Sequence, residues 1–203
     1  MKPLGLCASL ALLSSSAQAH AQTIVFSDDF DAENGGVGRL NYEGFAQWSV
    51  SDGALDLIGG GQSDFLPGNG LYLDLDGSLA NPDAATLTSL ALDLVAGRYE
   101  LQFDLSYNAE FASMRASDLL DIRVAGLGLR SLTSVEGLSQ DAFTPTVIGF
   151  DLEQATRGSI VFDHLGGDNG GFIIDNVSLV LIPSPGAVTM LGVAGLGVGR
   201  RRR

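Results

Sequence analysis

The chain contains 203 residues, of which 45% are hydrophobic, and it carries a formal net charge of −13 at pH 7. All 24 acidic residues lie between positions 22 and 182 together with six arginines, which gives this part a formal charge of −18. Such a charge argues against a nucleic-acid partner, because proteins that bind nucleic acids neutralise phosphates with basic residues. The single cysteine, Cys7, leaves no thiol for disulfides or Cys-based metal sites in the rest of the chain.

Residues 1–21 have the composition of a secretory signal peptide. Lys2 supplies one positive charge, and an apolar stretch follows over residues 4–13. Small residues then form two overlapping A-x-A sites, which end at Ala19 and Ala21. The alternative is a short buried helix, but the stretch lacks the polar face that such a helix turns to solvent. We therefore expect export of the chain and cleavage after Ala19 or Ala21.

Residues 22–182 are enough for one domain of about 160 residues. Within this part, apolar and polar residues alternate over short segments, which is the period of a β-strand with one buried face. In 98–107, for example, Tyr99, Leu101 and Phe103 fall on one side and charged or polar residues on the other. The expected strands are Thr23–Phe30, Phe45–Val50, Ala54–Ile58, Gly70–Leu75, Thr86–Leu94, Arg98–Tyr107, Leu119–Ala125, Leu127–Leu132, Thr146–Leu152, Gly158–His164 and Phe172–Leu181.

Two short connections between these segments predict tight turns. Ala96-Gly97 separates 86–94 from 98–107, and we expect these two segments to pair as an antiparallel hairpin. Asp52-Gly53 lies between two other segments and tolerates the positive φ that a tight hairpin needs. Helical periodicity is not sustained anywhere, and only 108–120 has room for a helical turn or two. The fold class that follows is all-β: two packed antiparallel sheets in a jelly-roll-like β-sandwich.

Residues 183–203 form a tail of three parts. The motif Pro183-Ser184-Pro185 comes first, an apolar run over 186–199 follows, and Arg200, Arg201, Arg202 and Arg203 end the chain. As a hydrophobic helix at about 1.5 Å per residue, the run reaches about 21 Å, short of the roughly 30 Å hydrocarbon core of a membrane. It is therefore a marginal anchor. The arginines resist transfer across a membrane and keep this end on the cytoplasmic side.

The tail resembles the sorting signals of PEP-CTERM proteins, which end in a Pro-Glu-Pro motif, a Gly- and Leu-rich transmembrane segment and an arginine cluster. Ser184 stands where that family usually has Glu. The resemblance implies that the tail holds the chain in the inner membrane only transiently. An exosortase-type protease would then cleave near 183–185 and deliver the protein to the cell surface or extracellular matrix. The alternative is an ordinary C-terminal anchor that stays attached.

Four segments of the body, GNGLYLDLDGS (68–78), TLTSLALDL (86–94), AGRYELQFDLSYN (96–108) and GGFIIDNVSLVLI (170–182), resemble exported β-sandwich proteins that often carry such tails. Those domains are similar to carbohydrate-binding modules and galactose-binding-like jelly rolls. The resemblance implies a non-enzymatic surface or matrix protein that binds carbohydrate, for example an exopolysaccharide. A structural or adhesive matrix protein that acts by protein contacts is the alternative, and a glycan-cleaving enzyme is a third.

Asp175 lies on the apolar side of the last expected strand. A carboxylate in that position costs several kcal/mol unless it is hydrogen bonded or bound to a cation. In the resembled jelly rolls the first and last strands lie near each other and can hold a structural calcium ion. The resemblance therefore implies Asp29 and Asp175 as calcium ligands, with Asp28 as a substitute. The alternative is that Asp175 caps a strand end or accepts bonds from backbone amides.

Three aromatic residues are candidates for stacking on a sugar ring, because an exposed ring offers a flat apolar face. They are Trp48, Tyr72 and Tyr107. The alternative for each of them is a place in the core of the sandwich.

Asp74 and Asp76 share one face of their expected strand with Tyr72, and a glycosidase needs two carboxylates. Neighbours on one strand do not readily flank a scissile bond from both sides, so a solvated or ligand-binding face is the preferred interpretation. His164 is the only histidine after residue 21, and no serine lies in a nucleophile-elbow motif. We therefore expect no enzymatic activity and no catalytic residues.

Overall fold

The computed structural model describes residues 22–61, 63–78, 84–108, 118–132, 138–166 and 170–183. The predicted signal peptide, with Cys7, and the predicted tail from Ser184 onward lie outside these ranges. In the ranges that are described, no helix is long and apolar enough to cross a membrane.

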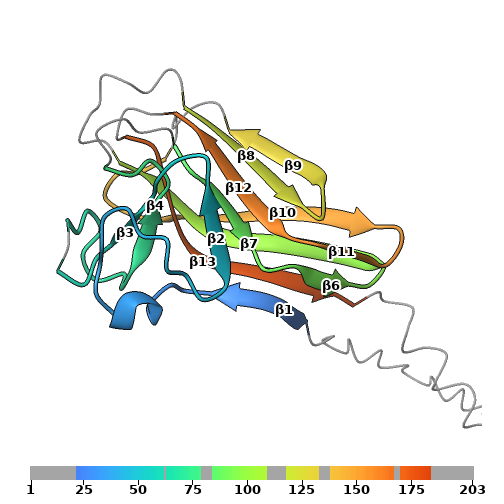
Figure 1. Ribbon diagram of the computed structural model, residues 1–203. Helices are drawn as coiled ribbons and strands as arrows, with labels where there is room; N and C mark the ends of the chain where they lie inside the picture. The colour runs from blue at the N-terminus through green and yellow to red at the C-terminus, as the bar shows by residue number, and fades with distance from the viewer. Residues whose placement is uncertain are drawn as a thin grey trace, which may run out of the picture.

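The described strands form two antiparallel sheets that pack against each other (Figure 1). The order in the first sheet is β10 (Thr144–Leu152), β7 (Gly97–Tyr107), β13 (Phe172–Ile182), β4 (Tyr72–Asp74) and β3 (Asp56–Ile58), and β1 (Thr23–Asp28) also pairs with β13. The order in the second is β2 (Trp48–Ser51), β5 (Thr86–Ser89), β12 (Ile160–Leu165), β8 (Leu119–Val124) and β9 (Leu127–Leu132). A small ribbon joins β6 (Leu92–Leu94) to β11 (Thr156–Gly158), and one 3-10 turn, η1, covers Glu33–Gly35.

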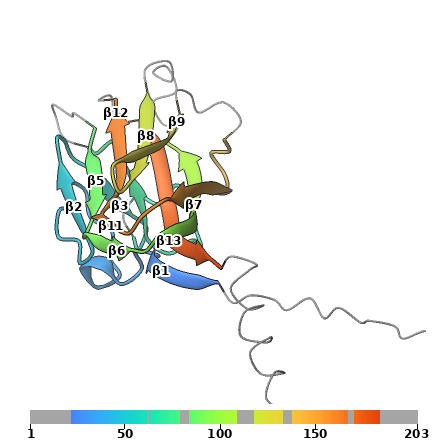
Figure 2. The same cartoon turned by 90° about the vertical axis from the view of Figure 1, so that its right-hand side faces the viewer.

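The two sheets enclose one hydrophobic core, and β7 shows how the alternating sequence builds it. Every second residue from Tyr99 to Leu105 is buried, whereas the residues between them are half-buried. Phe103 on β7 meets Phe162 on β12 edge to face, with ring centroids 5.3 Å apart. Figure 2 shows the two layers, with β2, β5, β12 and β8 on one side and β13 and β7 on the other. The predicted two-sheet antiparallel β-sandwich is therefore confirmed.

Both predicted hairpins are wrong, because the chain crosses between sheets at each turn. The segment 86–94 divides into β5, which joins the second sheet, and β6, which pairs with β11, whereas β7 belongs to the first sheet. Asp52 does adopt positive φ (65°), but β2 and β3, on either side of it, lie in different sheets. Alternation predicts which side of each strand is buried, but it does not predict which of the two sheets the strand joins.

The strand β13 lies at the centre of the first sheet. Along one edge it pairs with β7 over most of its length, and along the other it pairs with β4 and then β1. A bulge between Asp175 and Ser178 interrupts the pairing with β7, and Asn176 there adopts positive φ (50°). Bulges redirect side chains, and this one accompanies the burial of Asp175, which is 1% exposed.

Candidate functional site

The first carboxylate of the predicted calcium site, Asp28, is used in hydrogen bonds. Its Oδ2 accepts bonds from the Trp48 indole Nε1 at 2.9 Å and from the Gln47 amide Nε2 at 3.3 Å. Its Oδ1 accepts a bond from the backbone N–H of Phe30 at 2.9 Å. Asp29 accepts a longer bond, 3.2 Å, from the backbone N–H of Asp31. These two aspartates stabilise the turn after β1.

The carboxylate of Asp175 accepts hydrogen bonds from the next residue, Asn176. Its two carboxylate oxygens accept from the backbone N–H of Asn176 at 2.7 Å and from the Asn176 side-chain amide at 3.2 Å. Burial raises its pKa to about 8, the bond from the Asn176 amide lowers it, and the carboxylates of Asp104, Asp31 and Asp29 raise it. Asp175 thus accepts a bond from a backbone amide, as expected of the alternative to calcium binding.

The three predicted calcium ligands all accept hydrogen bonds from nearby groups. In the described ranges, no three His, Cys, Asp or Glu side chains converge so as to hold a metal ion. At Asp28 both oxygens accept hydrogen bonds, from Trp48, Gln47 and the turn after β1. Sequence alone could not show this, because the indole donor lies 20 residues further along the chain.

The three candidate stacking aromatics are core residues, so the expectation of exposed rings is not met. Trp48 is 4% exposed, Tyr72 0% and Tyr107 7%. Trp48 packs edge to face on Phe26, with a centroid distance of 5.2 Å, and Tyr72 packs on Phe143 at 5.7 Å. The Tyr72 hydroxyl donates to Asp64 at 2.9 Å and accepts from the backbone N–H of Leu66 at 2.8 Å. None of the three offers a free face to a sugar.

Trp48 should therefore matter for stability and not for ligand affinity. Trp48→Phe removes the donor to Asp28 and should lower the free energy of unfolding by about 1–3 kcal/mol. Asp28→Asn keeps an oxygen acceptor for the indole and should cost less. Urea unfolding followed by circular dichroism measures both, because Trp48 is the only tryptophan for a fluorescence signal. A variant of Trp48 that kept its stability but lost glycan binding would contradict this assignment.

A group of buried carboxyls lies where β3 and β4 pair. Asp56 and Asp74 are direct partners in the register, and Asp76 follows on the same side. Asp74 is 2% exposed and accepts bonds from the Asn108 side-chain amide at 2.9 Å and from the backbone N–H of Asp76 at 3.2 Å. Burial raises its pKa to about 8; these two bonds lower it, and the neighbouring carboxylates of Asp56 and Asp76 raise it. The pair predicted to be solvated or ligand-binding is thus buried.

His164 lies beside this group, at the end of β12. It is 1% exposed, and neither ring nitrogen has a hydrogen-bond partner among the described residues. Its Cε1 and a carboxylate oxygen of Asp118 lie 2.9 and 3.1 Å from the point that a Cβ on Gly166 would occupy. Burial lowers the pKa of His164 to about 4, against a small rise caused by Asp163. The imidazole is therefore neutral and packs edge to face on Phe172.

These shifts predict how stability depends on pH. A carboxyl whose pKa is about 8 when folded and 3.8 otherwise holds an extra proton in the folded state, so its contribution to stability is lost as pH rises through this range. His164 acts in the opposite direction, but only between pH 4 and 6.5. From pH 6.5 to 8 the free energy of unfolding should therefore fall, and Asp74 and Asp175 should both contribute to this fall.

The variant that tests this is Asp74→Asn, with the exposed Asp52→Asn as its control. Asp74→Asn should reduce the fall of the urea midpoint between pH 6.5 and 8 without abolishing it, because Asp175 still titrates there, and Asp52→Asn should leave the fall unchanged. The series is run with and without EDTA, because a bound cation near Asp175 would lower the pKa of that carboxyl. Equal slopes for the wild type and Asp74→Asn would contradict the prediction.

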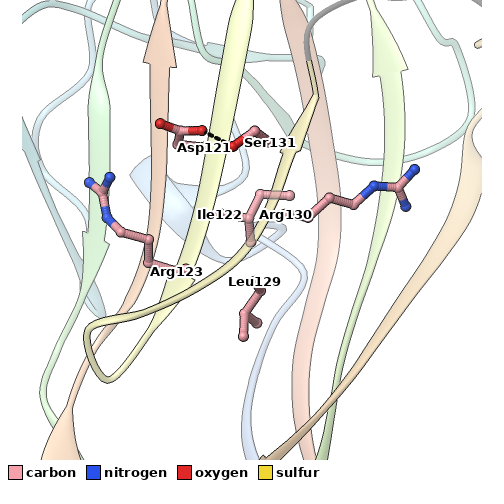
Figure 3. A pocket seen from close by; sticks show the side chains of 7 residues that line it. Asp121, Ile122, Arg123, Leu129, Arg130 and Ser131 are labelled. Carbon is pink, nitrogen blue, oxygen red and sulfur yellow. Dashed lines mark hydrogen bonds between the residues drawn. The ribbon is translucent and has the colours of Figure 1, made fainter.

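Two open grooves flank β9, the outermost strand of the second sheet. The hairpin groove, about 370 Å³, follows the β8–β9 hairpin where its register shifts, and is shown in Figure 3. Its lining residues are Asp121, Ile122, Arg123, Gly128, Leu129, Arg130 and Ser131. The edge groove, about 380 Å³, lies between β9 and β10. Its described lining residues are Leu105, Arg130, Leu132, Leu138, Thr144, Pro145, Thr146 and Val147.

The polar side chains of the hairpin divide between its two faces. Arg123 donates to Asp163 on β12 at 2.8 Å, and Asp163 also accepts from Thr86 on β5 at 2.9 Å. Figure 3 shows Arg130 extending to the opposite side from Arg123, and the Ser131 hydroxyl bonded to Asp121. Arg130 lines both grooves and connects them.

A third groove, the C-terminal groove of about 680 Å³, lies where β13 ends. It is lined by Ala96, Gly97, Arg98, Asp151, Leu152, Glu153, Leu181, Ile182 and Pro183. Sequence reasoning named Pro183 but none of the residues of the other two grooves. The sequence feature that could have pointed to these two grooves is Arg130, a basic residue within an expected strand of a strongly acidic chain. That feature does not show that the edges of β9 and β10 lie close together.

Comparisons with known proteins were made by sequence and by structure. No protein-family model matches the chain, and no curated protein is significantly similar to it in sequence. A cyclase from Fischerella sp. TAU is 14% identical, covers 81% of this chain and 99% of its own, and superposes with a TM-score of 0.56. The K3 cleaved adhesin domain of Lys-gingipain from Porphyromonas gingivalis w83 is 16% identical, with coverages of 79% and 99% and a TM-score of 0.51.

The fold is a jelly-roll-like β-sandwich. The CBM22-1 xylan-binding domain of Paenibacillus barcinonensis Xyn10C also aligns, with 11% identity, coverages of 82% and 99% and a TM-score of 0.48. At identities this low the likeness concerns the fold alone. A cyclase and an adhesin domain share it, so any function has to be argued from the grooves and side chains of this chain.

Proposed function

We propose that this chain is an exported, non-enzymatic surface or matrix protein whose sandwich binds carbohydrate. The observation that carries the proposal is the edge groove. It is open to solvent along two strand edges, it is of the size of a small-ligand site, and its lining combines hydroxyl groups with apolar side chains. A sugar presents the same mixture of hydroxyls and C–H faces.

The grooves supply the contacts that such a ligand needs. Thr144 and Thr146 offer hydroxyls on the core-facing side of β10, and Leu105, the register partner of Thr144, and Leu138 offer apolar surface beside them. Across the gap, Leu132 on β9 provides a second apolar wall. The adjoining hairpin groove adds the polar groups of the hairpin, so that a chain of several sugar units could follow β9 from one groove into the other.

The positions of the carboxyl groups support a binding protein and not an enzyme. The two carboxyls whose pKa values burial raises to about 8, Asp74 and Asp175, are buried and line none of the three grooves. Asp121, the carboxylate in the hairpin groove, is bonded to Ser131. A glycosidase needs a second carboxylate across the scissile bond, and the described lining of that groove does not supply one.

The proposal for localisation rests on the two ends of the sequence. Cleavage after Ala19 or Ala21 leaves a mature chain that begins just before β1, which starts at Thr23. At the other end β13 finishes at Ile182, next to Pro183 of the sorting motif. An exosortase-type protease would therefore find its motif directly after the folded domain, while the apolar run anchors the chain in the inner membrane.

A blocked groove should lose glycan binding. Thr146→Trp places a bulky ring in the edge groove and should lower affinity for a bound polysaccharide at least about tenfold. Thr88→Trp is the matched control, because Thr88 is also a half-buried strand residue but lies on β5. Glycan-array binding followed by titration calorimetry measures both. Undiminished binding by Thr146→Trp would place the site elsewhere, and no binding of any polysaccharide would refute the function.

Export and processing are tested by the mass of the mature protein in its native host. We expect a chain that begins at His20 or Gln22 and ends near Pro183, recovered from the surface or matrix fraction. Replacing the four C-terminal arginines with glutamine should lower the amount delivered. A full-length chain in the cytosol would contradict the proposal.

A structural or adhesive role by protein contacts is the second candidate, and one observation favours it. Both β9 and β10 are outermost strands, so each has an edge that no described strand pairs with. Such edges can accept a strand from another chain. Concentration-dependent self-association of the purified chain that Thr146→Trp abolishes, without any glycan binding by the wild type, would favour this role.

A further inference from the structure

The edge groove differs in charge from the domain around it. Residues 22–182 contain 24 acidic residues against six arginines. None of the described lining residues of this groove is Asp or Glu, and one of them is Arg130. The hairpin groove contains Asp121, and the C-terminal groove contains Asp151 and Glu153. Of the three, the edge groove is therefore the one whose charge suits an anionic ligand.

Arg130 is positioned to meet such a ligand. It is the register partner of Ile122, whose side chain lies in the core, so Arg130 projects from the core-facing side of β9 at the open edge of the sandwich. Its side chain is exposed and forms no ion pair with a described residue. Arg123 and Arg157, by contrast, are paired with Asp163 and Asp93.

We propose that the edge groove binds a saccharide that carries a carboxylate, and that Arg130 selects this ligand over neutral sugars. The inference rests on the proposed carbohydrate binding and names its ligand class. A guanidinium holds a carboxylate by two parallel hydrogen bonds, which a neutral hydroxymethyl group cannot reproduce. Thr144 and Thr146 are placed to bond ring hydroxyls, while Leu132 and Leu138 offer apolar surface to a C–H face.

Edge strands supply a competing explanation for the same arginine. A charge that points inward from an edge strand discourages pairing with another sheet. That role needs only a positive charge, which lysine also provides. Recognition of a carboxylate needs the planar fork of arginine, so the two roles separate in Arg130→Lys.

The experiment uses the full chain, purified in mild detergent, and titration calorimetry. The probes are trisaccharides of galacturonate, glucuronate and mannuronate, each beside its carboxyl-reduced counterpart of the same linkage. The wild type should bind at least one uronate about tenfold or more tightly than its reduced partner. Arg130→Gln should abolish this preference, and Arg130→Lys should lower affinity for the uronate about tenfold. Arg98→Gln, an exposed arginine of the C-terminal groove, is the matched control and should leave the preference intact.

The other outcomes are distinguishable. If wild type binds uronate and reduced sugar equally, and Thr146→Trp still removes that binding, the carbohydrate function stands and this inference is overturned. If Arg130→Gln aggregates while Arg130→Lys stays soluble and keeps full affinity, Arg130 protects the edge and does not select the ligand. If no saccharide of either kind binds, both the inference and the proposed function fail.

Discussion

The structure depends on the burial of β13 between two sets of partners. This strand pairs with β7 along one edge and with β4 and β1 along the other, while its inward side chains pack into the core. It joins the beginning, middle and end of the domain in one sheet. On both β7 and β12 alternate side chains point into the core, where Phe103 and Phe162 meet. The two sheets therefore pack on one shared core. No disulfide is available to this domain, so burial of apolar surface carries its stability.

The carboxylates divide into those that the fold buries and those that it leaves in water. Asp74 and Asp175 are buried with amide donors beside them, and their pKa values rise because the charged form loses solvation. Asp28 holds an indole and a turn together. These residues tie β1, β4 and β13 to the loops around them. The clustering of acidic residues in the sequence is thus in part a set of buried hydrogen bonds, and not only a solvated surface.

A sandwich of two open sheets cannot pair its outermost strands, and this constraint produces the grooves. Where β9 and β10 approach each other, the core is covered only partly and its margin is lined by Thr144, Thr146 and Leu132. The register shift in the β8–β9 hairpin opens the neighbouring groove. Arg130 belongs to both. The proposed binding site therefore lies where two outermost strands each have an edge that no described strand pairs with.

The sequence by itself determined the fold class and the buried face of most strands, because alternation is a local property that follows from the two-residue period of a strand. It also determined the signal-like and tail-like composition of the two ends. Only the tertiary structure decided which sheet each strand joined, since β5 and β7 have similar patterns and yet lie in different layers. It likewise decided that Trp48, Tyr72 and Tyr107 are core residues, that Asp28 is bonded to an indole, and that Arg130 faces β10. Those outcomes depend on contacts between residues far apart in the chain, and no local pattern specifies such contacts.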